Sequence, residues 1–259
     1  MDFTNLVRWV YAHRFTLKYL NAKLRPATSF SQAQEDLWIL KTLRKVDFFV
    51  DVGAHDGISY SNSALFALNG AKGICFEPVK ESYWKLSAFH RVNRRVICNN
   101  YGISDHDCLT PMRIAGGLSY VINTEDSQHS FHFGALQRVK KQKSVELCRL
   151  DDALLKLHAP LVIDLLSIDV EGHELNVLAS VPFDKYFFRA IILETHLDDQ
   201  VNKKRTWMHR DINLIENLLV KNGYFAAHET WANTIYLHES QRHQLITENL
   251  KCPGNNDSL

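Results

Sequence analysis

The segment Asp51-Val-Gly-Ala-His-Asp-Gly57 combines an acid with two glycines in a short turn. It follows an apolar run and precedes a helical pattern, so backbone amides and the helix amino end can approach a ligand there. Its Gly-x-x-x-Gly spacing does not match the dinucleotide fingerprint, and it lacks the lysine of a phosphate-binding loop. Asp51 favours an ammonium over a pyrophosphate, although such a turn can also be an ordinary tight connection.

A second acid, Glu77, ends the next apolar run. Parallel strand order would place it beside the glycine turn, where a carboxylate accepts hydrogen bonds from both hydroxyls of a ribose. A surface carboxylate that caps a helix is the alternative. Tyr101-Gly-Ile-Ser-Asp105 follows the third run and could border an adenine, with Ile103 against the ring and Ser104 or Asp105 bonded to its exocyclic amine. These segments indicate a nucleoside ligand.

Apolar runs alternate with helical patterns from Val46 onward. The predicted strands are 46–51, 73–77, 95–100, 161–169, 189–194, 224–227 and 234–238, and the predicted helices end near Asn69 and cover 151–158 and 211–222. Near-continuous apolar strands separated by helices predict an α/β fold with a parallel sheet covered on both faces. Segment 106–150 predicts an insertion with a β-hairpin that shapes a substrate site.

Residues 3–24 carry apolar, aromatic and basic residues at helical spacing, which predicts an amphipathic helix that ends near Arg25-Pro26. We expect this helix to pack on the domain, with peripheral membrane contact or partner docking as the alternative. The predicted organisation is an N-terminal extension at 1–29, a main domain at 30–239 and a frayed tail at 240–259.

The composition is that of a globular protein, with 46% hydrophobic and 23% charged residues and a net charge of +1. This balance does not favour a nucleic-acid partner. The basic stretch Arg138–Lys143 predicts a solvated loop or, alternatively, a contact to an anionic substrate. No apolar run approaches the ~20 residues of a membrane span. The five cysteines form no Cys-x-x-Cys pair, which argues against zinc and for a reducing, cytoplasmic location.

Several segments, taken in order, resemble the FkbM-type methyltransferases. They are the glycine turn with Tyr60-Ser-Asn62, Phe76-Glu-Pro78, Tyr101–Asp105, Leu150-Asp-Asp152, Ser167-Ile-Asp-Val-Glu-Gly-His-Glu174 with Val177-Leu178, and the preceding element Ser31–Asp36. The resemblance runs from about residue 30 to 238. It implies a class I, Rossmann-like α/β fold with a seven-stranded, mostly parallel sheet in the order 3-2-1-4-5-7-6, its last strand antiparallel, and helices on both faces.

The resemblance implies S-adenosylmethionine as cofactor. Asp51, Gly53 and Gly57 would line its methionine part and Glu77 its ribose, and His55 stands where many relatives carry asparagine. The cofactor-binding candidates are Glu35, Asp51, Gly53, Ala54, His55, Gly57, Asn62, Glu77, Pro78, Ser104, Asp105 and Asp169.

Family members mostly methylate hydroxyls of sugars, glycan chains and polyketides. The resemblance therefore predicts an O-methyltransferase that acts on a sugar hydroxyl of a glycan or glycosylated metabolite, with a polyketide or other non-sugar hydroxyl as the alternative. Such an enzyme must align the hydroxyl and remove its proton. Asp169 is the first candidate for the base, followed by His173 and His196. Asp169, Glu194 and His196 could also hold Mg²⁺ or Mn²⁺, although no ligand motif demands a metal.

Other function classes remain open. A noncatalytic binding module would have an acid-poor acceptor face, and a nicotinamide oxidoreductase would need a different glycine spacing. The chain has no Asn-Pro-Pro-Tyr-like motif of the kind that indicates nucleic-acid methylation. Within the insertion, polar and aromatic side chains suit a sugar, which has hydroxyls at its rim and C–H faces that stack on rings. These residues are Tyr120, Asn123, His129, Phe131 and His132.

Overall fold

The structure, a computed structural model, describes residues 3–24, 28–122, 141–195 and 206–243. Within these ranges no helix combines the length and the hydrophobicity that a membrane span requires. The helices are α1 (Phe3–Lys23), α2 (Glu35–Leu43), α3 (Ala64–Leu68), α4 (Lys80–Phe89), α5 (Leu150–Lys156), α6 (Glu174–Ala179) and α8 (Thr206–Lys221), with short 3₁₀ turns η1 (His90–Val92), η2 (Gly116–Leu118) and η5 (Glu239–Gln241).

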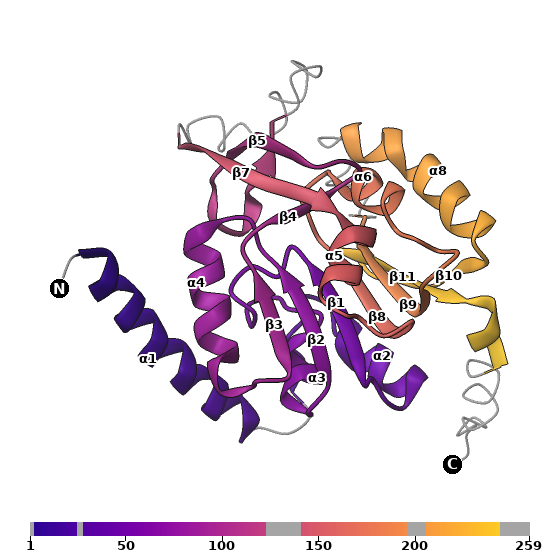
Figure 1. The fold of residues 1–259 in the computed structure, drawn as a ribbon. Coiled ribbons are helices and arrows are strands. Elements are labelled where there is room, and N and C mark those ends of the chain that lie inside the picture. Colours follow the sequence, from indigo (N-terminus) through magenta and orange to yellow (C-terminus); the bar gives the residue numbers. More distant parts are fainter. Residues whose placement is uncertain (1–2, 25–27, 123–140, 196–205, 244–259) are drawn as a thin grey trace, which may run out of the picture.

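The main sheet contains all seven strands that the sequence predicts, with ends shifted by no more than two residues. They are β1 (Phe48–Val52), β2 (Lys72–Phe76), β3 (Val96–Asn99), β8 (Val162–Ile168), β9 (Phe187–Glu194), β10 (Tyr224–Glu229) and β11 (Asn233–His238). The pairs from β3 through β9 are parallel, whereas β11 is antiparallel to both of its neighbours. The expected class I methyltransferase-like α/β fold is confirmed at this level (Figure 1).

The observed order of the main sheet is 3-2-1-8-9-11-10. It differs from the expected 3-2-1-4-5-7-6 because four strands that come between β3 and β8 in the chain form a second sheet. The expected order numbered only the strands of a single sheet, so it left no numbers for the four strands of the second sheet. The sheet is also mixed in direction, since β11 runs against the other strands.

Two apolar layers cover the main sheet because its strands are hydrophobic on both faces. One layer packs side chains of α5, α6 and α8 against one face, with Leu154, Val177 and Leu219 fully buried. The other packs α2, α3 and α4 against the opposite face, where Ile39 and Leu86 are fully buried. Successive residues of a strand point to opposite faces, so a continuous apolar run supplies both layers.

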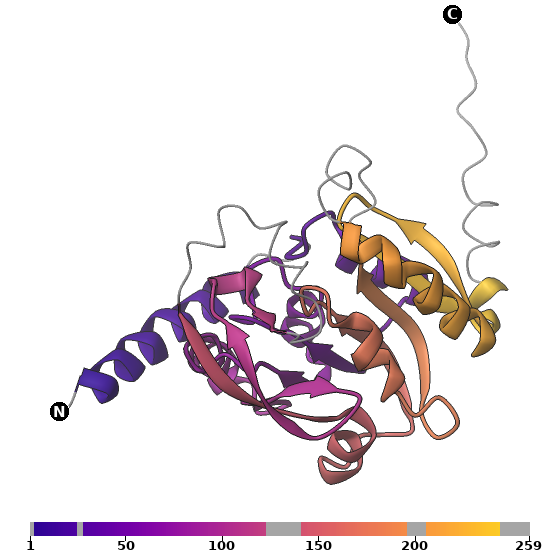
Figure 2. The same ribbon diagram turned by 90° about the horizontal axis from the view of Figure 1, so that it is seen from above.

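The predicted insertion forms a four-stranded sheet of its own. Its strands are β4 (Gly102–Ser104), β5 (Cys108–Arg113), β6 (Tyr120–Val121) and β7 (Gln142–Arg149), in the order β4-β7-β5-β6. The expected hairpin is present as the antiparallel pair of the consecutive strands β5 and β6, and β7 pairs antiparallel with the other edge of β5. The sheet begins earlier than predicted, because β4 pairs with β7 in parallel. Figure 1 shows it at the top of the molecule, beyond the upper ends of β2 and β3, and Figure 2 shows it from above.

Helix α1 packs against α4 at the outer edge of the molecule, as Figures 1 and 2 both show. Phe15 and Tyr19 bury their rings against Leu68, Ala88 and Phe89. The hydroxyl of Thr16 donates a 3.3 Å hydrogen bond to the carbonyl oxygen of Ala88. The predicted helix is therefore present and packs on the domain. The domain limits at 29 and 239 stay predictions.

Gly73 tests the packing between β1 and β2. It pairs with Phe49, and a Cβ atom at Gly73 would lie 2.3 Å from Cζ of that fully buried ring. We expect Gly73→Ala to lower the free energy of unfolding by about 1–3 kcal/mol, because the closely packed ring must shift. Urea denaturation measures this change. Gly117→Ala is the control, since its Cβ would lie 3.9 Å from the nearest atom. Equal stability of both variants would contradict the packing described.

Candidate functional site

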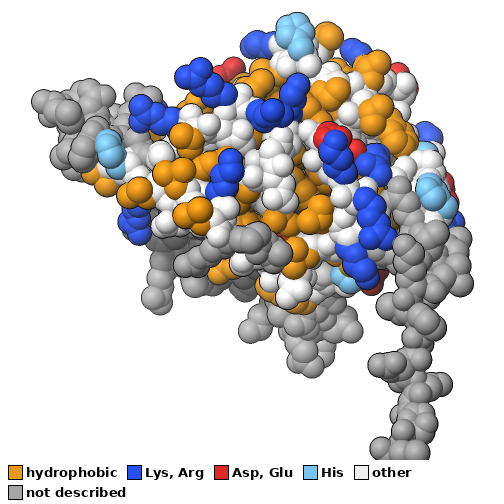
Figure 3. All heavy atoms as spheres, turned by 90° about the horizontal axis from the view of Figure 1, so that it is seen from below, with side chains coloured by type: hydrophobic (Ala, Val, Ile, Leu, Met, Phe, Trp, Pro, Cys, Tyr) orange, Lys and Arg blue, Asp and Glu red, His pale blue; other side chains and the backbone are white. Residues whose placement is uncertain are grey.

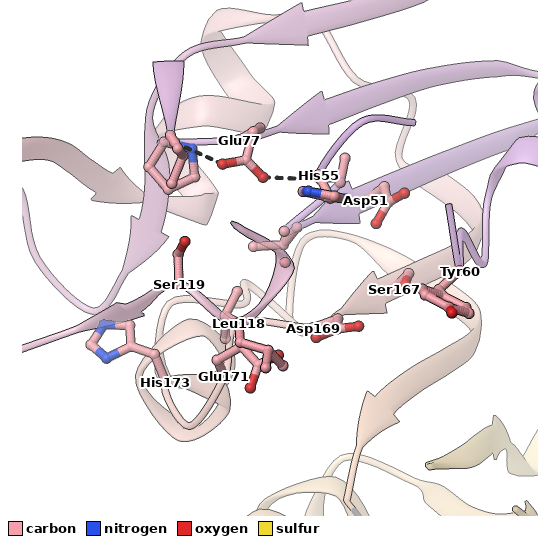
Figure 4. Close-up of a pocket in the computed structure, with 18 of the residues that line it drawn as sticks. Asp51, His55, Tyr60, Glu77, Leu118, Ser119, Ser167, Asp169, Glu171 and His173 are labelled. Atoms are coloured by element: carbon pink, nitrogen blue, oxygen red, sulfur yellow. Dashed lines mark hydrogen bonds between the residues drawn. The ribbon is translucent and has the colours of Figure 1, made fainter. Parts of the chain in front are cut away.

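A cavity of about 580 Å³ opens where β1, β2 and β8 end. Its wall combines the glycine turn, the loop after β8 and the second sheet (Figure 4). Of the predicted site residues, those on the wall are Asp51, Gly53, Ala54, His55, Asn62, Glu77, Pro78, Asp169 and His173. Residues far apart in the sequence thus meet at one edge of the sheet, as expected for the carboxyl ends of parallel strands.

Backbone hydrogen bonds tie the three strand ends together. The N–H groups of Gly53 and Ala54 both donate to the carbonyl oxygen of Phe76, at 3.0 and 3.1 Å. The N–H of Asp169 donates to the carbonyl oxygen of Val52 at 3.0 Å. Gly53 has a φ of +90°, and a Cβ atom there would lie 1.8 Å from the carbonyl oxygen of Asp169. Only glycine allows this conformation and this approach.

Glu77 is held by the backbone at the rim of the cavity. One carboxylate oxygen accepts from the N–H of His55 at 2.9 Å, and the other accepts from the N–H of Val79 at 2.7 Å (Figure 4). The side chain is 5% exposed, and this burial raises its pKa to about 8 despite the two hydrogen bonds. Each oxygen keeps a lone pair for a further donor, so the carboxylate can accept from a ligand in the cavity.

Asp51 and Asn62 form a polar cluster beside the glycine turn. The hydroxyl of Ser63 donates to Asp51 at 2.5 Å, and the amide nitrogen of Asn62 donates to the hydroxyl of Ser167 at 3.2 Å. Burial raises the pKa of Asp51 to about 6, although hydrogen bonds from Ser63 and Ser167 oppose the shift. The amide oxygen of Asn62 is buried without a hydrogen-bond partner. A buried acceptor of this kind suits a ligand that brings a donor.

Three carboxylates meet behind the other side of the cavity, and two of them, Asp169 and Glu171, line it. Asp169, Glu171 and Glu194 bring oxygen atoms within 4.8 Å of one another. Burial raises the pKa of Asp169, the charge of Glu35 adds to the shift, and a hydrogen bond with Glu194 opposes it. Glu171 has a φ of +53°, an uncommon conformation for a residue with a side chain. A raised pKa lets Asp169 exchange a proton near neutral pH.

The side chain of Glu174 fixes the loop that carries these acids. Its carboxylate accepts from the N–H groups of Val170 and Gly172, at 3.3 and 3.0 Å. Glu174 therefore stabilises the turn through hydrogen bonds to its backbone, and it does not line the cavity.

The structure separates Ser104 and Asp105 from the cavity wall. The hydroxyl of Ser104 lies 3.0 Å from Asp105 and 2.9 Å from Nε2 of His173, and it is His173 that reaches the cavity. Ser104 and Asp105 do not line the cavity, and the hydroxyl of Ser104 is engaged by both Asp105 and His173, so their contact with an adenine stays a prediction. Ile103, the third residue of that prediction, does line the wall.

Glu35 and Gly57 also lie off the wall. Glu35 is fully buried and accepts hydrogen bonds from Asn233 at 2.7 Å and Thr230 at 2.8 Å, so it joins α2 to β11. A Cβ atom at Gly57 would meet Leu86 at 2.8 Å, which shows that this glycine faces the core. The contacts of Glu35 and the packing of Gly57 both involve residues distant in the sequence, so the local sequence pattern did not indicate them. His196 lies outside the described residues.

Several wall residues were not predicted as site residues. They include Gln32, Tyr60, Ser61, Leu118, Ser119, Ser167 and Glu171. Ser167 and Glu171 each lie two positions from Asp169 in the sequence, so the prediction of Asp169 as a site residue could have been extended to them. Leu118 and Ser119 belong to the second sheet's 3₁₀ turn region and carry no local signal, because only the folding of the insertion brings them to the cavity.

Asp51 gives a prediction for stability against pH. Its folded pKa lies above the unfolded value of about 3.8, so its ionisation costs stability as the pH rises from about 4 through 6. Without ligand, we expect Asp51→Asn to be more stable than the wild type at pH 8, by on the order of 2 kcal/mol, and to lose this advantage at pH 4. Thermal melts at both values measure it.

The matched control is Asp47→Asn, because Asp47 is exposed at the opposite ends of the strands. A loss of stability in Asp51→Asn that is equal at both pH values would mean that the hydrogen bond from Ser63 outweighs the burial of charge.

Comparison with known proteins adds the family. A model described as the methyltransferase FkbM domain matches residues 51–225. No curated protein matched the chain. Among solved structures, methyltransferase FkbM from Methylobacillus flagellatus is similar with 14% identity and a TM-score of 0.44, over 90% of this chain and 58% of that chain. This chain therefore spans little more than half the length of that relative.

Two O-methyltransferase structures are similar at comparable levels. A putative O-methyltransferase from Klebsiella pneumoniae has 11% identity and a TM-score of 0.44, over 88% of this chain and 89% of that chain. The O-methyltransferase from Bacillus cereus in complex with SAH has 12% identity and a TM-score of 0.46, over 88% and 89%. The family model, in contrast, covers more than half of this chain. Because this model covers well over half of the chain, the chain belongs to the FkbM methyltransferase family.

Proposed function

We propose that this enzyme transfers the methyl group of S-adenosylmethionine to a sugar hydroxyl of a glycan or glycosylated metabolite. The observation that carries the cofactor assignment is the charge of the cavity wall. Among the described residues that line it are the acids Asp51, Glu77, Asp169 and Glu171, with no lysine or arginine. Such a wall attracts a ligand with an ammonium and a sulfonium, and it offers a pyrophosphate no cation.

The residues present fit this cofactor. Asp51 and the buried amide oxygen of Asn62 would receive its ammonium, and the lone pairs of Glu77 would accept from the ribose hydroxyls. The apolar part of the wall, with Val79, Ile103 and Leu147, would hold the adenine. When bound, S-adenosylmethionine supplies an activated methyl group. Gly53 keeps the turn free of a side chain that would fill the same space.

Asp169 is our proposed base. It lies on the cavity wall at the end of β8, and its burial favours uptake of a proton near neutral pH. Glu194, to which it is hydrogen bonded, holds the carboxyl group in place. His173 faces the same cavity, but burial lowers its pKa and Ser104 already engages its Nε2. This favours a positioning role for His173, whereas the alternative His196 lies outside the described residues.

The second sheet supports the choice of acceptor. Leu118 and Ser119 line the same cavity as Asp169 and Glu171 (Figure 4), and Gln32 and Tyr60 belong to the same wall. An apolar side chain among hydroxyl and amide groups suits a sugar, which presents both C–H faces and hydroxyls. Of the insertion residues that the sequence suggested for this role, Tyr120 is described and is not on the wall. Asn123, His129, Phe131 and His132 lie outside the described residues.

Cofactor binding is tested by the thermal shift that S-adenosylhomocysteine produces. We expect Glu77→Ala to weaken binding by roughly tenfold to a hundredfold, because hydrogen bonds to a charged group contribute about 1.5–3 kcal/mol. Glu77→Gln keeps one acceptor oxygen, so its affinity for S-adenosylhomocysteine should lie between those of the wild type and Glu77→Ala. Asp105→Ala is the control, since Asp105 does not line the cavity. Unchanged affinity in Glu77→Ala, or a shift with NAD alone, would contradict the cofactor assignment.

Catalysis is tested with radiolabelled S-adenosylmethionine and a panel of mono- and oligosaccharides, with polyketide alcohols as comparison. For any acceptor found, we expect Asp169→Asn to reduce kcat by roughly a hundredfold or more and to leave cofactor affinity within about threefold. Because burial raises its pKa, wild-type kcat should fall as the pH drops and Asp169 takes up a proton. Methylation of non-sugar alcohols only would exclude the sugar assignment, and full activity in Asp169→Asn would exclude this base.

A further inference from the structure

Helix α1 presents a second apolar face that no described part of the chain covers. Val10, Leu17, Leu20 and Leu24 are 44%, 60%, 46% and 79% exposed. Their spacing of seven, three and four residues keeps them on one side of the helix. The opposite side carries Phe15 and Tyr19, which are buried against α4. The helix is thus apolar on two sides, and packing on the domain explains only one of them.

Cationic side chains surround this exposed apolar face. The sequence of α1 contains no Asp or Glu, and its described cationic residues Arg14, Lys18 and Lys23 are exposed or half-buried. The turn η1, which contacts α1, adds exposed Arg91 and a 52% exposed Val92. Seen from below, the molecule shows hydrophobic side chains among Lys and Arg side chains at the left, toward the N-terminal end (Figure 3).

We propose that α1 docks this enzyme on an anionic lipid bilayer, with the helix lying in the plane of the interface. An apolar stripe flanked by cations matches a bilayer surface, because acyl chains receive the leucines while anionic headgroups attract the lysines and arginines. Nucleic acid offers no comparable apolar environment for Leu17 and Leu24. The helix would lie on the bilayer and not cross it, because it is long enough for a membrane span but not apolar enough. This proposal does not depend on the identity of the acceptor.

The experiment is sedimentation of the full chain with vesicles. One set contains phosphatidylcholine alone, and in the other about a third of the lipid is phosphatidylglycerol. We expect binding to the anionic vesicles at least about tenfold tighter than to the neutral ones, and weakened by salt. Leu17→Ser with Leu20→Ser should lose about tenfold or more in affinity. Arg14→Gln with Lys23→Gln should lose the preference for anionic lipid.

The control combines Leu155→Ser with Lys156→Gln on α5, where Leu155 is 57% exposed and Lys156 is exposed. Figures 1 and 2 place α5 away from α1. This variant should bind vesicles as the wild type does, and circular dichroism melts should show all variants folded, because every substituted side chain is exposed.

Several results would overturn the proposal. One is equal binding of wild type and the Leu17/Leu20 variant to anionic vesicles. Another is that the wild type is a dimer and the Leu17/Leu20 variant a monomer, while neither protein binds vesicles. This result would assign the face to a second copy of the chain. Binding of an RNA duplex that the Arg14/Lys23 variant loses, without vesicle binding, would assign it to nucleic acid.

Discussion

At Gly53 the chain passes the carbonyl group of Asp169 so closely that there is no room for a Cβ atom. This approach brings the end of β1 against the end of β8, and the shared carbonyl of Phe76 draws in the end of β2. Asp51, Glu77 and Asp169 converge on one cavity only because these three strand ends are tied in this way. A side chain at position 53 would separate them and would also occupy the space next to the turn.

Buried acids at the two ends of the main sheet differ in whether the protein itself balances their charge. At the amino ends, Asp164 accepts from the N–H groups of Asp47 and Phe48 and from Arg189, so its charge is balanced within the protein. At the carboxyl ends, Asp51 and Glu77 have raised pKa values because burial outweighs their hydrogen bonds. The first arrangement stabilises the fold. The second leaves electrostatic attraction for a cationic ligand, which is typical of a functional site.

The strands of the main sheet could be predicted well because each is a short apolar run that can be recognised from neighbouring residues alone. Val162–Ile168 is a nearly continuous apolar run, and no distant residue is needed to recognise it. The positions of Asp51, Glu77 and Asp169 followed from the strands, since parallel topology fixes where their carboxyl ends meet. Most of the predicted residues that line the cavity lie within three positions of a strand end, whereas Asn62 and His173 lie further along their loops.

Two predicted cofactor-binding residues that lie off the cavity wall, Ser104 and Glu35, contact segments distant in the chain. The hydroxyl of Ser104 turned out to be engaged by His173, and Glu35 by Asn233 at the far end of the chain. No periodicity encodes such pairs. The parallel pairing of β4 with β7 escaped prediction for the same reason, because three residues, Gly102–Ser104, are too short to show alternation.

The second sheet has a consequence for how this protein can evolve. Met112 of β5 pairs with Val121 of β6 on one side and with Lys143 of β7 on the other, so the chain leaves and re-enters the sheet beside a single residue. The pairing of these strands therefore fixes where the connection after Val121 begins and where it returns at Gln142. Since the entropy of closing a loop depends only weakly on its length, a longer or shorter connection costs the strand pairing little. Selection can thus vary the length of this connection while the tied ends of β1, β2 and β8 stay unchanged.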